Sequence, residues 1–168
     1  KVYPKIILAC LLLVMTGTVY SQRVTQTIND GWKFSLFEGD ASTADFDISG
    51  WTDVSIPHTW NAKDADDEIP GYFRGKGWYR KVVAVEELIP EQRVYLSFEG
   101  ANQETNVFVN GTFVGNHKGG YSAFTFDVTD YVHAGRNLIA VSVDNSHNSD
   151  IAPLSADFTF FGGIYRDV

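Results

Sequence analysis

Two segments of the chain carry residue types that bind a neutral, hydroxylated ligand. The first comprises residues 57–61 (PHTWN), the acidic residues 64–68 and the aromatic-rich residues 71–81, and the second comprises residues 144–157 followed by the aromatic run 158–161. Carboxylate and amide groups hydrogen-bond to sugar hydroxyls, and aromatic rings cover the apolar face of a sugar. Long loops with such side chains often carry binding sites. The alternative is that these aromatics belong to the core and the acids are solvated, and composition alone leaves both open.

Other kinds of site have less support from residue spacing. The four histidines, at positions 58, 117, 133 and 147, have no cysteine or histidine partner at ligand spacing, so no metal site is predicted. No Gly-x-Ser-x-Gly elbow of a serine hydrolase occurs. The glycine-rich residues 71–77 (GYFRGKG) lack the Gly-Lys-Ser/Thr ending of a phosphate loop. A turn that leads into a strand explains them better.

The composition narrows the class of protein. The chain has 168 residues, which suits one ordinary domain, and its 14% aromatic content is too high for a disordered polymer. A formal charge of −8, with no clustered Lys or Arg, argues against nucleic acid as a partner. A soluble acidic protein with neutral ligands is the expectation.

Residues 1–21 have the pattern of a secretory signal peptide. Two lysines precede an apolar run over residues 6–15, and small or polar residues then lead to a cleavage site near Ser21. A run of this length is too short to span a bilayer, so we expect export to the periplasm or the extracellular space and no membrane span. Lipidation at Cys10 is an alternative, although this cysteine lies inside the apolar run rather than after it. Cleavage removes two lysines and no acid, so the formal charge falls to −10.

From Val24 onward the pattern predicts an all-β domain over residues 22–168. Apolar residues alternate with polar ones, and turn residues interrupt them at short intervals, which is typical of a two-sheet β-sandwich. Asn110-Gly111 predicts a type I′ hairpin turn, because both positions of that turn need positive φ. The predicted strands cover residues 32–37, 78–85, 94–98, 105–109, 124–128 and 138–143, with a last one that begins at Gly163. Helical turns are expected only at residues 41–48 and 129–133.

Six motifs, in order along the chain, resemble a known domain. They are Asp30-Gly31-Trp32-Lys33-Phe34, Pro57-His58-Thr59-Trp60-Asn61, Gly77-Trp78-Tyr79-Arg80-Lys81, Phe98-Glu99-Gly100, Val107-Phe108-Val109-Asn110-Gly111 and Gly162-Gly163-Ile164-Tyr165-Arg166-Asp167-Val168. Any one of them is a weak signal, but the ordered set resembles the N-terminal sugar-binding domain of glycoside hydrolase family 2. This family includes β-galactosidases, β-glucuronidases and β-mannosidases.

The resemblance implies a galactose-binding-like jelly-roll sandwich that belongs to a larger enzyme. In the family, this domain packs against an immunoglobulin-like domain and a TIM barrel, and two barrel glutamates about 5 Å apart perform retaining hydrolysis. The chain ends before such domains would begin, so we expect no catalytic residue in it. The expected parent is an exported glycosidase, in particular a β-galactosidase, that acts on a β-linked oligosaccharide or glycoside. No cofactor is expected for this domain, and a cation in the parent and the oligomeric state are left open.

The resemblance also implies which residues contact the sugar. In the family, an aspartate eleven positions before the valine of the Gly-Ile-x-Arg-x-Val motif reaches the sugar in the barrel, and Asp157 holds that position here. The loop before Gly77 supplies a second contact, for which Asn61 and Arg74 are the candidates. Arg74 stands where galactosidases of the family can have Asn, which leaves the identity of the sugar open. A stand-alone carbohydrate-binding module without catalysis, or an adhesive sandwich, remains an alternative function.

Overall fold

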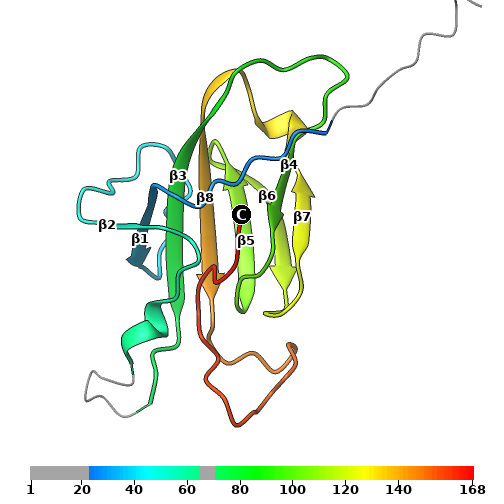
Figure 1. Ribbon diagram of the computed structural model, residues 1–168. Coiled ribbons are helices and arrows are strands. Elements are labelled where there is room, and N and C mark those ends of the chain that lie inside the picture. The colour runs from blue at the N-terminus through cyan, green and yellow to red at the C-terminus, as the bar shows by residue number, and fades with distance from the viewer. Residues whose placement is uncertain (1–22, 65–70) are drawn as a thin grey trace, which may run out of the picture.

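The computed structural model describes residues 23–64 and 71–168, and these form an all-β sandwich as predicted (Figure 1). The predicted signal peptide and the acidic residues 66–68 lie outside the described residues. The strands are β1 (Trp32–Leu36), β2 (Thr52–Val54), β3 (Lys76–Val85), β4 (Tyr95–Phe98), β5 (Glu104–Val109), β6 (Thr112–Lys118), β7 (Phe124–Asp127) and β8 (Gly135–Asp144). Two short 3₁₀ helices, η1 (Trp60–Lys63) and η2 (Thr129–Tyr131), lie between strands. Within the described residues, no helix is long and apolar enough to traverse a bilayer.

The strands form two antiparallel sheets. The larger sheet has the order β2-β1-β3-β8-β5-β6, and β4 and β7 form the smaller one. Strands β3 and β8 lie at the centre of the larger sheet and pair over ten residues, from Lys76 opposite Asp144 to Val85 opposite Gly135. Such a long ladder makes this pair a rigid base for the loops at its two ends (Figure 1).

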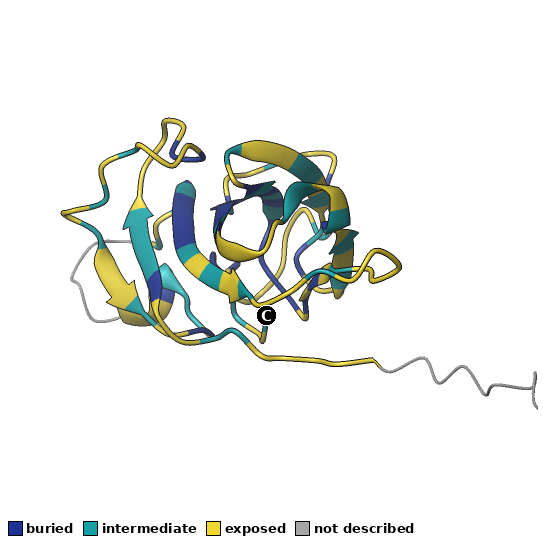
Figure 2. Cartoon of the chain, turned by 90° about the horizontal axis from the view of Figure 1, so that it is seen from above, coloured by how far each residue is buried: buried dark blue, intermediate teal, exposed yellow. Residues whose placement is uncertain are grey.

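The main core lies between the two sheets. Alternate residues of each strand point into it, among them Tyr79 from β3, Phe98 from β4 and Val141 from β8, each fully buried. The ring of Phe98 stacks on Phe124 of β7 at 4.9 Å, which joins the two strands of the smaller sheet on their inner face. Seen from above, most of the buried positions lie on strands toward the middle of the molecule and most of the exposed ones toward its periphery (Figure 2). Each large side chain that is fully buried contributes about 1.5–3 kcal/mol to folding.

The outer face of β3 and β8 is also covered. Trp78 and Ala140 point to this face and pack with Ala41, Phe46 and Trp51 of the segment between β1 and β2. The indole nitrogen of Trp78 donates to the carbonyl oxygen of Gly39 at 3.0 Å, which fixes this segment over the sheet. Both faces of β3 and β8 are therefore covered around Trp78 and Ala140, whereas Val82, farther along β3, is exposed.

Most of the predicted strands are confirmed within two or three residues. The predicted hairpin is confirmed as well, because Asn110 and Gly111 have φ values of 52° and 82° and join β5 to β6. This turn needs positive φ at both positions, which asparagine and glycine tolerate better than other residues.

Other predictions were wrong. No strand begins at Gly163, which forms only an isolated bridge with Asn102. The carbonyl groups of the residues after it accept hydrogen bonds from His58, Glu99 and Ile28, which belong to three different segments, so no continuous ladder forms. Residues 41–48 contain one hydrogen-bonded turn, in which the Phe46 amide donates to the carbonyl oxygen of Thr43 at 3.4 Å, but no helix, and the chain here covers the outer face of the sheet. Strand β2 and helix η1 were missed.

Candidate functional site

The two segments singled out in the sequence meet at one end of the sandwich. The β2–β3 loop (residues 55–75, of which 65–70 are outside the described residues) and the β8 loop (residues 145–163) both lie at the lower end in Figure 1. The Asn61 side chain accepts a hydrogen bond from the Gly162 amide at 2.6 Å, although these residues are 101 positions apart. The two loops therefore meet in the folded domain.

Packing around Trp60 brings the loops together. Thr59 caps η1 by accepting a bond from the Asn61 amide at 3.2 Å, and the Trp60 ring stacks on Phe34 with centroids 5.8 Å apart. The same indole meets Gly162, where a Cβ atom would lie only 2.0 Å from Cζ2 of the ring. A glycine at this position is therefore required for the β8 loop to pass against Trp60.

Asn61 lies behind the surface rather than on it. Its side chain is 2% exposed, and its amide nitrogen donates to Asp64 Oδ2 at 2.7 Å and to the carbonyl oxygen of Phe73 at 2.8 Å. Its oxygen accepts from Gly162 and from Asn145 Nδ2. A direct contact with a sugar, as predicted, would require one of these bonds to break. That contact stays a prediction, whereas the bonds that hold the two loops are part of the fold.

Arg74 lies between aromatic rings contributed by both loops. Its guanidinium carbon is 5.3 Å from the Tyr72 ring centroid and 5.0 Å from that of Phe160. Its Nε is buried and has no hydrogen-bond partner among the described residues. The cation–π attraction of the two rings favours this position of the guanidinium, whose terminal nitrogens are hydrogen-bond donors.

Asp157 is exposed next to an aromatic patch. The patch consists of Tyr121 and Phe158, each at least half exposed, with their rings edge to face at 6.2 Å. The Phe158 ring also contacts the Phe160 ring, with centroids 5.3 Å apart, and the Phe160 ring in turn contacts Arg74. Burial and the nearby Tyr165 and Tyr72 raise the pKa of the Tyr121 phenol, which keeps it neutral. An acid, an arginine and apolar rings thus lie at one end of the sandwich.

Tyr121 was missed in the sequence. It lies between β6 and β7, in the short stretch Gly119-Gly120-Tyr121-Ser122, and the aromatic residue between turn residues was the available signal. Its contact with Phe158 joins residues 37 positions apart, which local patterns do not reveal.

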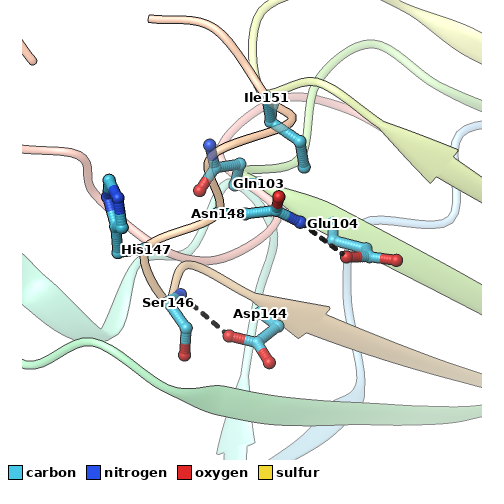
Figure 3. Close-up of a pocket in the computed structure, with 7 residues that line it drawn as sticks. All are labelled: Gln103, Glu104, Asp144, Ser146, His147, Asn148 and Ile151. Carbon is cyan, nitrogen blue, oxygen red and sulfur yellow. Dashed lines mark hydrogen bonds between the residues drawn. The ribbon is translucent and has the colours of Figure 1, made fainter. Parts of the chain in front are cut away.

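A polar pocket of about 90 Å³ lies beside the β8 loop, at the ends of β5 and β8 (Figure 3). Most of its groups are already paired, because Asn148 donates to Glu104 at 3.4 Å and the Ser146 amide donates to Asp144 at 2.8 Å. Pockets that enclose small organic ligands measure roughly 300–1,000 Å³. This pocket is therefore too small to enclose a sugar ring.

His58 serves the fold at this end. Its Nδ1 lies 2.8 Å from the hydroxyl of Tyr79, which also accepts a bond from the Ile164 amide at 3.4 Å. Burial lowers the pKa of His58, so the ring is neutral near pH 7. The ring contacts Tyr79 of β3, and the backbone amide of His58 donates to the carbonyl oxygen of Ile164 at 2.7 Å, so His58 joins β3 to the C-terminal segment. Across residues 23–64 and 71–168, His, Cys, Asp and Glu side chains nowhere gather in threes that could bind a metal ion.

Comparisons with known proteins agree with this architecture. The family profile described as "Glycosyl hydrolases family 2, sugar binding domain" matches residues 25–168. A crystal structure of Bacteroides uniformis β-glucuronidase is 47% identical, covers 87% of this chain and 17% of its own, and superposes with a TM-score of 0.80. A putative β-glucuronidase of Formosa agariphila is 37% identical over 99% of this chain and 21% of its own length. A β-galactosidase of Thermoanaerobacter pseudethanolicus is 40% identical over 86% of this chain and 19% of its own length.

The chain spans about a fifth of the length of these relatives. The match covers both loops of the candidate site and all eight strands. Together with the sandwich fold, this coverage shows that the chain belongs to glycosyl hydrolase family 2, as the sugar-binding domain of that family.

Proposed function

We propose that this domain is part of a larger, exported, retaining glycoside hydrolase and that it helps to bind the terminal sugar of a β-glycoside. The observation that carries the proposal is the family match over residues 25–168, in a chain about a fifth as long as relatives named as glycosidases. That proportion favours a domain of an enzyme over a stand-alone carbohydrate-binding module. We assign the sandwich to the galactose-binding-like jelly rolls, with an immunoglobulin-like domain and a TIM barrel elsewhere in the parent.

Asp157 is the residue that we propose to contact the sugar. Its carboxylate is exposed, and an ionised carboxylate accepts two hydroxyl hydrogen bonds that are stronger than neutral ones. Phe158 and Tyr121 beside it offer apolar surface to the face of the ring. Arg74 is the second candidate, because its guanidinium lies beside the Tyr72 and Phe160 rings and carries hydrogen-bond donors at the same end of the domain.

The bond-breaking step belongs to other domains in this proposal. One glutamate of the barrel would protonate the leaving oxygen and the other would attack the anomeric carbon, at a separation of about 5 Å. The domain described here orients the sugar and supplies a wall of the site, and no cofactor is needed for this role. Correct orientation raises the rate because the reacting atoms then start close to the attack geometry.

The substrate is proposed to be a β-galactoside or a β-glucuronide, since relatives of similar identity carry both names. The test is to express the full-length parent and to measure hydrolysis of the 4-nitrophenyl β-galactoside and β-glucuronide. We expect release of nitrophenol from at least one of them, with retention of the anomeric configuration. A folded parent that cleaves neither glycoside would contradict the proposed function.

Export is the remaining part of the proposal, and it rests on the pattern of residues 1–21. Expression of the parent in a bacterial host with an intact secretory pathway should yield a protein whose N-terminus begins near Gln22. Intact-mass measurement distinguishes this product from the alternatives. An uncleaved N-terminus would contradict export by this signal, and a diacylglycerol on Cys10 would identify a lipoprotein instead.

A further inference from the structure

Asn145 connects three segments at the end of the sandwich where Asp157 lies. Its side chain is fully buried, and its oxygen accepts from the Gly75 amide at 2.9 Å. Its amide nitrogen donates to the carbonyl oxygen of Phe160 at 2.9 Å. The same nitrogen makes longer hydrogen bonds, each of 3.3 Å, to the carbonyl oxygen of Phe73 and to Asn61 Oδ1. Asn145 thus binds the end of the β2–β3 loop on one side and the β8 loop on the other.

Asn61 continues this network. Its side-chain oxygen accepts hydrogen bonds from Asn145 Nδ2 and from the Gly162 amide. Its side-chain nitrogen donates to the carbonyl oxygen of Phe73. The two asparagines therefore hold the backbone of the β8 loop at Phe160 and Gly162, on the C-terminal side of Asp157. They hold the β2–β3 loop at Phe73 and Gly75, on either side of Arg74.

We infer that Asn145, together with Asn61, is a positioning residue that sets Asp157 in register for the sugar. The inference rests on the proposed function, and it assigns to Asn145 a role that acts through Asp157 and not by contact with substrate. A buried amide network is stable only when its members are paired, so loss of Asn145 leaves the Gly75 amide and the Phe160 carbonyl without this partner. The β8 loop then shifts, and a displacement of about 1 Å in a binding group can cost up to about 100-fold in rate.

Strand β8, which Asn145 follows, offers a matched control near its other end. Asn137 is 1% exposed, donates to His133 O at 2.7 Å and accepts from the His133 amide and from Asn110 Nδ2, both at 2.9 Å. It therefore resembles Asn145 in burial and in bonding. The two residues lie eight positions apart along extended chain, roughly 27 Å, so Asn137 is remote from Asp157.

The experiment compares Asn145→Ala and Asn137→Ala in the full-length parent, each in the wild-type and in the Asp157→Ala background. Both single variants should lower the melting temperature by similar amounts. Only Asn145→Ala should lower kcat/KM, by about 10- to 100-fold. In the Asp157→Ala background the effect of Asn145→Ala on kcat/KM should shrink to less than about twofold, because a residue that acts through another loses its effect when that residue is absent.

Two results would overturn the inference. One is an equal fold-loss from Asn145→Ala in both backgrounds, and the other is a loss no larger than that from Asn137→Ala. If Asn145→Ala does not fold, Asn145→Ser retains a hydroxyl that can make one of the bonds, and the same comparison is made with it. An inactive parent, or unchanged kcat/KM in Asp157→Ala, would instead contradict the proposed function, so the two failures are distinguishable.

Discussion

Replacement of Asp157 by Ala in the full-length parent is expected to lower kcat/KM by about 30- to 1,000-fold, which corresponds to about 2–4 kcal/mol of transition-state stabilisation. The carboxylate is exposed beside the aromatic patch of Tyr121 and Phe158, where it can accept two hydroxyl hydrogen bonds. Because the side chain is exposed, its removal should leave the melting temperature nearly unchanged. Steady-state kinetics on the preferred nitrophenyl glycoside measures the effect.

The chain supplies a matched control for this variant. Asp150 is an exposed aspartate of the same loop, and Asp150→Ala should leave kcat/KM within about twofold of the wild-type value. Asp157→Asn keeps the shape but loses the charge, so its kcat/KM should fall between those of the wild type and Asp157→Ala. Equal activity of the Asp150 and Asp157 alanine variants would show that Asp157 does not bind the sugar.

The substitution Gly163→Ala is expected to destabilise the domain by about 3–4 kcal/mol. Gly163 has a φ of +123°, and a Cβ atom there would lie 2.5 Å from the carbonyl oxygen of His58 and 2.7 Å from the Tyr79 hydroxyl. Neither group can move away easily, because the Tyr79 hydroxyl is hydrogen-bonded to the His58 ring and the His58 amide donates to the carbonyl oxygen of Ile164. Thermal unfolding should show a melting temperature lower by roughly 6–16 °C for a domain of this size.

Gly50→Ala is the comparison for this effect. Gly50 has no atom within 4 Å of its would-be Cβ and is not among the glycines with positive φ, so alanine there should change stability by less than about 0.5 kcal/mol. A melting temperature of Gly163→Ala equal to that of Gly50→Ala would mean that the C-terminal segment is not packed as described.

The strands were predictable because their pattern is local. Val107 and Val109 are buried while Asn106 and Phe108 are less so, and this alternation is visible in the sequence itself. The turn at Asn110-Gly111 was predictable for the same reason, because its conformation depends on two adjacent residues. The strand expected from Gly163 onward failed because extended conformation is local, whereas a strand also needs a continuous partner that lies elsewhere in the chain.

The candidate site was predictable only in outline. The lengths and composition of the two loops indicated a binding region, and Asp157 was singled out by a family resemblance rather than by its local pattern. Asn145 carried no signal, because an asparagine after a strand is typical of a turn. Its importance comes from contacts with Gly75 and Phe160, which lie 70 and 15 positions away. Asn61 was a candidate for the second sugar contact that the family resemblance implies, and the structure shows it 2% exposed with its amide already hydrogen-bonded.

The central claim is that this domain contributes Asp157 to the sugar site of a larger glycosidase. A crystal structure of the full-length parent with a bound, non-hydrolysable glycoside tests it most directly. We expect a carboxylate oxygen of Asp157 within about 2.5–3.0 Å of a sugar hydroxyl oxygen. A bound sugar that lies away from this carboxylate, with no direct or water-mediated hydrogen bond to it, would contradict the claim.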